Sequence, residues 1–234
     1  MDHTAQQFPE AGLGVSRIEF IRSTYMHLAG AIVGFTILSA VLYATGFGQA
    51  ALKLMGASKW IWLGFLGAFM VVGWFATHLA DNAESNQKQL MGLGVYVLAE
   101  ALIFSPLFAL AGLIAPGAIG AAAFITLVLV GGLTYTAFTV KTDFSFLGSI
   151  LKVAGIVALG AIVASLIFGF SLGIWFSAIM VIFAGGCVLY DTGQIIHHYP
   201  TDRPAGAALH LFASIALMLW YVLRILLSLA SSDD

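Results

Sequence analysis

The stretch AIGAAAFITLVLVGGLTYTAFTV, at residues 118–140, contains no charged side chain. A helix needs about 20 consecutive apolar residues to cross the hydrocarbon core of a bilayer. The stretch is long enough for this, and it is continuously apolar where a strand of a membrane barrel would alternate. It therefore predicts a transmembrane α-helix, in which every backbone polar group is satisfied inside the segment.

Six other stretches of the chain have the same character. Polar or turn-forming breaks separate them, of which DNAESNQKQ (81–89) and HHYPTDRPAG (197–206) are the clearest. The sequence predicts an all-α integral membrane protein, a bundle of seven transmembrane helices. We expect a single domain at 23–230, a polar N-terminal tail at 1–22 and a short C-terminal tail at 231–234. The six other spans are 24–46, 60–80, 90–113, 148–168, 173–196 and 206–229.

The overall composition agrees with a lipid environment. Hydrophobic residues make up 61% of the 234 residues and charged residues 9%, and the mean hydropathy is +1.01. A soluble domain has about 25% charged residues, so the expected partner of this surface is the lipid bilayer. The net charge of −2 gives no strong attraction to nucleic acid. The single cysteine, Cys187, rules out an internal disulfide framework.

The sequence carries none of the common enzyme signatures. It has no G-x-S-x-G elbow, no H-E-x-x-H, no P-loop and no dinucleotide fingerprint. We therefore expect neither enzymatic activity nor a bound cofactor. An intramembrane protease that uses Ser214 or Asp191 is the enzymatic alternative, and the absence of a second aspartate in a matched motif argues against the aspartyl type.

Positive charges in short loops predict the orientation, because Lys and Arg accumulate on the cytoplasmic side. A cytoplasmic N-terminus and an external C-terminus in the inner (plasma) membrane follow from this rule. The inner side then holds Arg17, Arg22, Lys88, Lys141, Lys152 and Arg203, and the outer side holds Lys53, Lys59 and Arg224.

Ionisable side chains inside the spans are candidate functional residues, because a charge in hydrocarbon is costly and is usually paired or faces a cavity. Glu100 and Asp191 are the two such carboxylates. Each can switch charge, or bind a cation when it is ionised. The structural alternatives are a hydrogen bond from a protonated Glu100 and a water-capped helix end at Asp191. Histidines near the inner helix ends suggest either a pH sensor or ordinary interfacial positions: His27, His78, His197, His198 and His210.

Two segments resemble the Bax inhibitor-1 family, and most closely its bacterial YccA-like branch. They are YDTGQIIHHYPTDRPAGAALHLFASIALMLWYVLRILLSL (190–229) and TYTAFTVKTDFSFLGSILKVAGIV (134–157). The resemblance implies a central helix surrounded by the others and a pH-sensitive calcium leak. For the YccA-like branch it also implies association with an FtsH-type membrane protease, whose action the protein restrains.

The resemblance also implies a pH sensor built from two aspartates on helices six and seven, latched to a basic residue on helix two. Asp191 matches the helix-six aspartate, Ser214 stands at the helix-seven position, and the helix-two position falls near His78. Because the second aspartate is absent, Glu100 is the candidate substitute partner. The leading hypothesis is a pH-responsive calcium leak in which Asp191 binds calcium transiently. The alternative is a non-conducting membrane protein that modulates an FtsH-type protease.

Overall fold

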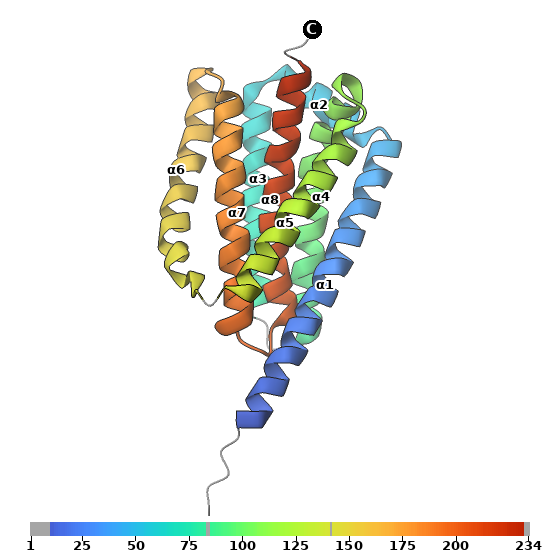
Figure 1. Ribbon diagram of the computed structural model, residues 1–234. Helices are drawn as coiled ribbons and strands as arrows, with labels where there is room; N and C mark the ends of the chain where they lie inside the picture. The colour runs from blue at the N-terminus through green and yellow to red at the C-terminus, as the bar shows by residue number, and fades with distance from the viewer. Residues whose placement is uncertain (1–9, 83–84, 141, 232–234) are drawn as a thin grey trace, which may run out of the picture.

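The computed structural model describes residues 10–82, 85–140 and 142–231 (Figure 1). Seven of the described helices are long and apolar enough to cross a membrane, and α2 is the exception. This result confirms the predicted all-α, seven-span class. In chain order the elements are α1 (Glu10–Ala44), α2 (Phe47–Ala57), α3 (Lys59–Asn82), α4 (Asn86–Ile114), α5 (Ala118–Thr139), the 3-10 helix η1 (Phe144–Phe146), α6 (Leu147–Phe168), α7 (Gly173–His197) and α8 (Pro204–Ala230).

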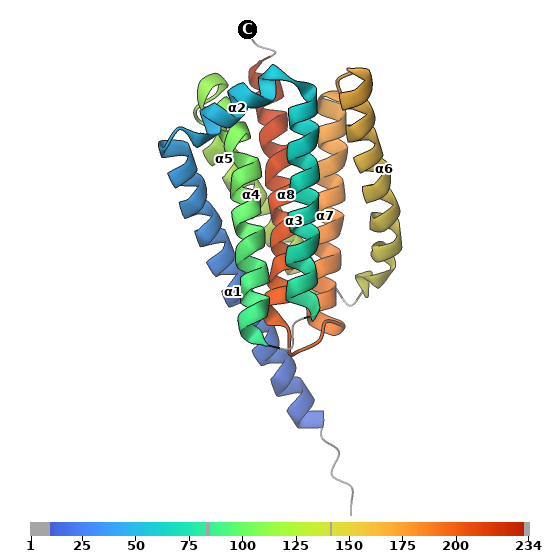
Figure 2. The ribbon, with the colours of Figure 1, turned by 180° about the vertical axis from the view of Figure 1, so that it is seen from behind.

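Helix α8 lies at the centre of the bundle, as the views from both sides show (Figures 1 and 2). It packs against α1, α3, α4, α5 and α7. Its Phe212 ring lies 5.9 Å from Phe35 of α1, which in turn lies 5.1 Å from Phe104 of α4. Edge-to-face ring pairs of this kind stabilise a core beyond the area they bury. The central helix implied by the resemblance is therefore α8.

Helix α6 lies at the periphery and packs against α7, η1 and α3. None of its residues is buried, and apolar side chains such as Val153 and Ile156 are more than 60% exposed. Exposure of these apolar side chains to water would cost free energy, whereas exposure to hydrocarbon does not. The exposure of α6 therefore agrees with a bundle that is surrounded by lipid.

Helix α1 is longer than a membrane span requires. Its 35 residues extend about 52 Å, and its N-terminal part projects beyond the rest of the bundle (Figure 1). Residues 10–22, which the sequence assigned to a polar tail, are therefore helical. Tertiary contacts explain this difference, because Phe20 is 3% exposed and its ring stacks 6.1 Å from that of Tyr199. Residues 1–9 and 232–234 of the predicted tails lie outside the described residues.

The short helix α2 was not predicted from the sequence. It lies across the end of the bundle where α8 also ends (Figure 1), and Gly46, with a φ of 78°, makes the turn from α1 into it. This end, which also carries the turn at 169–172, is called the α2 end below. The opposite end, with the α7–α8 loop at 198–203, is called the loop end.

The crossing of α3 and α4 depends on a glycine, which gives a first prediction. A Cβ atom at Gly92 would lie 2.7 Å from the carbonyl oxygen of Ala76 and 2.9 Å from the nitrogen of Ala80. We expect Gly92→Ala to lower the free energy of unfolding by about 1–3 kcal/mol, because backbone atoms must move apart. Thermal unfolding in detergent measures this loss. Gly94→Ala is the matched control, since a Cβ there meets nothing within 4 Å, and equal losses in both variants would contradict the packing argument.

Candidate functional site

The candidate site begins with a hydrogen bond between α7 and α8. The hydroxyl of Ser214 donates to Oδ2 of Asp191 at 2.5 Å. Ser214 is buried and Asp191 is partly buried. Ser214, at the position where the resemblance implies a second aspartate, is therefore the direct partner of Asp191, and its hydroxyl can stabilise the carboxylate without repelling it.

Asp191 lines a cavity of about 160 Å³, which we call the loop-end cavity. The cavity explains why an acidic side chain inside a span keeps some accessible surface. Polar groups from α7, α8 and the loop between them surround it, so it is suited to hold water or a cation. The lining residues are Tyr190, Asp191, Gln194, Ile195, Tyr199, Ala207 and His210.

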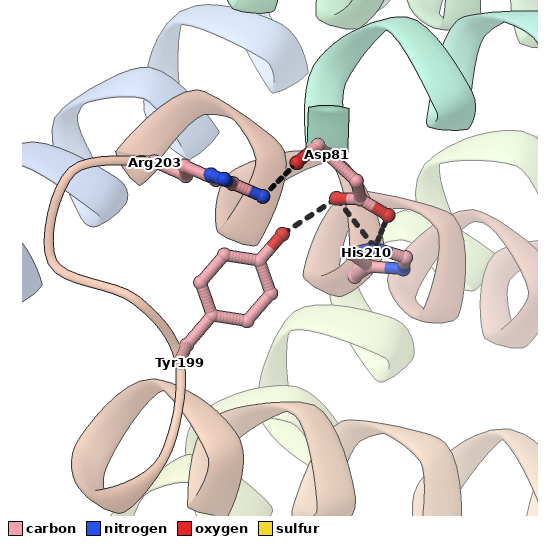
Figure 3. Close-up of polar contacts among 4 residues, drawn as sticks. All are labelled: Asp81, Tyr199, Arg203 and His210. Atoms are coloured by element: carbon pink, nitrogen blue, oxygen red, sulfur yellow. Dashed lines mark hydrogen bonds and ion pairs between the residues drawn. The ribbon is translucent and has the colours of Figure 1, made fainter. Parts of the chain in front are cut away.

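His210 connects this cavity to a second acidic residue, Asp81, at the end of α3 (Figure 3). Nε2 of His210 lies 2.9 and 3.1 Å from the two carboxylate oxygens of Asp81. The Tyr199 hydroxyl donates to Oδ1 of Asp81 at 2.6 Å, and the Arg203 guanidinium donates to the Asp81 backbone carbonyl. We call these four residues the Asp81 cluster. It joins the end of α3 to α8 and to the α7–α8 loop.

Gly206 allows Tyr199 and Asp81 to approach α8 closely. A Cβ atom there would lie 2.8 Å from the Tyr199 hydroxyl and 3.1 Å from Oδ1 of Asp81. Any larger side chain would therefore displace the groups that hold the cluster together. The burial of the Tyr199 hydroxyl and its hydrogen bond to the Asp81 carboxylate both raise the pKa of Tyr199. Tyr199 therefore stays protonated, and it acts as a hydrogen-bond donor at physiological pH.

Three further contacts hold the α7–α8 loop over the loop end. Arg17 of α1 donates to the backbone carbonyl of Tyr199 at 2.6 Å. Gln89 of α4 donates to the carbonyl of Asp202 at 3.1 Å. His198 pairs with Asp143 at 3.1 Å. The loop is therefore tied to α1, α3, α4 and the segment before η1, and its residue Tyr199 lines the loop-end cavity.

Asp143 is ionised over the whole physiological range. The side chain and the backbone N–H of Ser145 donate to its carboxylate and lower the pKa of Asp143 to about 2. Because the pKa is lower in the folded chain than in the unfolded chain, the contribution of the Asp143 carboxylate to folding stability is present at neutral pH. It is lost only as the pH falls toward 2. Asp143 therefore has no part in any charge change between pH 5 and 8.

Glu100 lies in a different environment from Asp191. It is 6% exposed, and its hydrogen-bond partner is Tyr96, one helical turn earlier on α4. It lines a cleft of about 940 Å³, which we call the large cleft, and Ser214 lines the same cleft. No hydrogen bond or ion pair joins Glu100 to Asp191 in the part of the chain that the structure describes.

The remaining predicted site residue, His78, lies on the exposed side of α3. Its ring stacks on Trp74 with the centroids 5.6 Å apart. Asp81, three residues later, is the α3 residue that meets α8. The structure therefore joins Asp191 to Ser214 by a hydrogen bond. Glu100 shares only the large cleft with Ser214, and His78 lies on the exposed side of α3.

Sequence reasoning missed the Asp81 cluster, although one signal was present. His210 precedes Ser214 by four residues, so both lie on one face of α8. Asp81 gave no comparable signal, because it is only the first residue of a polar break. Among the described residues, no group of three His, Cys, Asp or Glu side chains could hold a metal ion.

The fold and the site together define a class: a multi-pass membrane protein. The described residues form seven helices able to span a membrane, and an acid–hydroxyl pair lies between the loop-end cavity and the large cleft. The chain matches the family described as "Inhibitor of apoptosis-promoting Bax1" over residues 17–232. It therefore belongs to the Bax inhibitor-1 family, which is not an enzyme family. The match confirms the resemblance seen in the sequence.

Similar bacterial proteins cover nearly the whole chain. An uncharacterized protein of Neisseria meningitidis serogroup A is 26% identical over 224 residues, which are 94% of this chain and 95% of the relative. One from serogroup B has the same identity and coverage. An uncharacterized protein of Campylobacter jejuni is 29% identical over 213 residues, 88% of this chain and 87% of the relative. These relatives are similar in length as well as in sequence.

Proposed function

We propose that this protein is a pH-responsive leak for cations, with calcium as the expected ion, and that Asp191 is its gate. One observation carries the proposal. The Asp191–Ser214 hydrogen bond lies between the loop-end cavity, which Asp191 lines, and the large cleft, which Ser214 lines. A path that joins the two spaces at this bond would pass the pair.

The chemistry of the pair supports a gate. An ionised Asp191 attracts a cation from the loop-end cavity, and a carboxylate oxygen is a preferred ligand of calcium. Protonation removes the attraction and leaves two neutral groups that are hydrogen-bonded across the helix interface. The large cleft beyond the pair is mainly apolar, so the resting path is closed to a hydrated ion.

The Asp81 cluster supplies a second control at the loop end. The bonds of the Asp81 carboxylate to Tyr199 and His210 tie the α7–α8 loop to α3 and α8, so loss of the charge on Asp81 would loosen the loop. The proposed response to pH therefore depends on Asp191 at the gate, while Asp81 holds the loop. His210 lies between them, because it lines the cavity and bonds to Asp81.

Flux measurements on the purified full-length chain test this proposal. Proteoliposomes loaded with a calcium indicator should show protein-dependent calcium entry that changes between pH 5 and 8. Protein-free liposomes give the background. Flux at background level at every pH would overturn the proposed leak.

The proposed location is the inner (plasma) membrane, with the N-terminus in the cytoplasm and the C-terminus outside. The excess of Lys and Arg in the loops at the loop end supports this orientation. Reporter fusions to Met1 and Asp234 should report opposite compartments. Two fusions in the same compartment would contradict the odd number of spans.

The second candidate function is modulation of an FtsH-type membrane protease without conduction. The N-terminal part of α1 supports it, because this part projects beyond the bundle at the loop end (Figure 1). We expect deletion of residues 1–16 to weaken co-purification with such a protease. The matched control removes 231–234 at the other terminus. Equal recovery of the protease with both truncated chains would contradict a role for the N-terminal segment.

A further inference from the structure

We infer that the large cleft holds one acyl chain of an anionic membrane lipid, with the lipid headgroup beside Arg224 at the α2 end. The cleft volume of about 940 Å³ lies near the top of the range of about 300–1,000 Å³ for small-molecule sites. Helices α2, α3, α4, α6 and α8 and the turn at 169–172 all contribute to its walls. It is thus a space enclosed by several elements.

The walls of the large cleft are suited to a hydrocarbon chain. Most are aromatic or aliphatic, including Phe69, Phe104, Leu107, Leu166 and Trp220. Water in such a space would leave its hydrogen bonds unmet at the depth of the bilayer core. An acyl chain fills apolar space without needing polar partners, and lipid surrounds the neighbouring helices α3 and α6.

The mouth of the cleft lies at the α2 end. The exposed lining residues are Gly56, Phe170, Ser171 and Arg224, and all four lie at this end. The deep part is lined by buried residues that include Glu100 and Ser214. A chain that enters at the mouth therefore runs toward the middle of the membrane, as a lipid tail does.

Charge determines which headgroup the mouth accepts. Arg224 is the basic residue among the lining residues, and no acidic residue in the described part of the chain forms an ion pair with it. A guanidinium binds phosphate by paired hydrogen bonds. The acidic Glu100 lies at the deep end, so an anionic headgroup is favoured at the mouth only. A lipid with one phosphate and no cationic group fits this arrangement.

Occupancy of the cleft would have a consequence for the gate. The lipid tail would cover Ser214 on the side opposite to the loop-end cavity, and would close the path at rest. This consequence rests on the proposed leak, whereas lipid binding itself does not. A crosslinking readout can therefore fail or succeed independently of any flux measurement.

The test uses the full-length protein in phosphatidylcholine vesicles with a small fraction of phosphatidylglycerol that carries a diazirine in one acyl chain. After irradiation, mass spectrometry locates the adducts. We expect adducts on cleft-lining residues of α4 and α8. Arg224→Gln should lower their yield about fivefold, which is the upper end of the effect expected from the loss of one accessible ion pair. Lys53→Gln is the matched control, because Lys53 is exposed on α2 and does not line the cleft.

A second variant tests the cleft itself. Ala213→Phe places a ring in the large cleft, since Ala213 lines it and is partly exposed. It should abolish the adducts in the cleft and leave those on the exposed face of α6 unchanged. Equal labelling by a phosphatidylcholine probe, no effect of Arg224→Gln, or crosslinked protein dimers in place of lipid adducts would each overturn the inference.

Discussion

Replacement of Asp191 by asparagine is expected to remove most of the pH dependence of calcium flux in proteoliposomes. Asparagine keeps the shape of the protonated acid, and its side-chain carbonyl can still accept from Ser214. It cannot ionise, so neither proton binding nor strong cation attraction remains at the gate. The flux of the variant should therefore be nearly constant between pH 5 and 8, and low, because the permanently neutral side chain resembles the closed state.

Two controls accompany this variant. Asp143→Asn should leave the shape of the pH profile unchanged, whatever the absolute flux, because the pKa of Asp143 is about 2 and the group does not titrate in this range. Glu100→Gln should act independently of Asp191→Asn, because no bond joins the two acids, and effects at separate sites add within about 0.5 kcal/mol. A pH profile in Asp191→Asn as steep as that of the wild type would exclude Asp191 as the gate.

Replacement of Asp81 by asparagine is expected to open the loop end. The neutral amide keeps an acceptor for the Tyr199 hydroxyl but loses the charge that holds His210. Hydrogen bonds to charged groups contribute about 1.5–3 kcal/mol. A loss of about 1.4 kcal/mol from the closed form raises the open fraction tenfold. Resting calcium flux should therefore rise about tenfold, and the thermal unfolding midpoint in detergent should fall.

Asp202→Asn is the matched control for this second substitution. Asp202 lies in the same loop, and its side chain is 72% exposed. Among the described residues its carboxylate pairs only with the adjacent Arg203, at 3.6 Å. An exposed pair of this kind contributes little, so flux and stability should stay close to wild type. If Asp81→Asn also leaves both quantities unchanged, the Asp81 cluster does not hold the loop closed.

Long apolar runs such as 118–140 predicted every transmembrane helix, because the thickness of a bilayer fixes the length of a span. The same reasoning found Asp191, since an acid in an apolar run stands out. The helix α2 was not predicted, because it is too short to span a bilayer. The predicted tail extended to residue 22, because Arg17 and Arg22 are typical of loop residues.

The sequence by itself determined the membrane class, the number of spans and the position of Asp191 along its helix. These properties depend on local composition and on length. Only the tertiary structure decided the partners across helices: Ser214 for Asp191 and His210 for Asp81. Asp81 and His210 are separated by 129 positions in the chain. They meet because helix packing sets the rotation of α3 and α8, and a helix's own apolar pattern cannot show this rotation when lipid and protein core are both apolar.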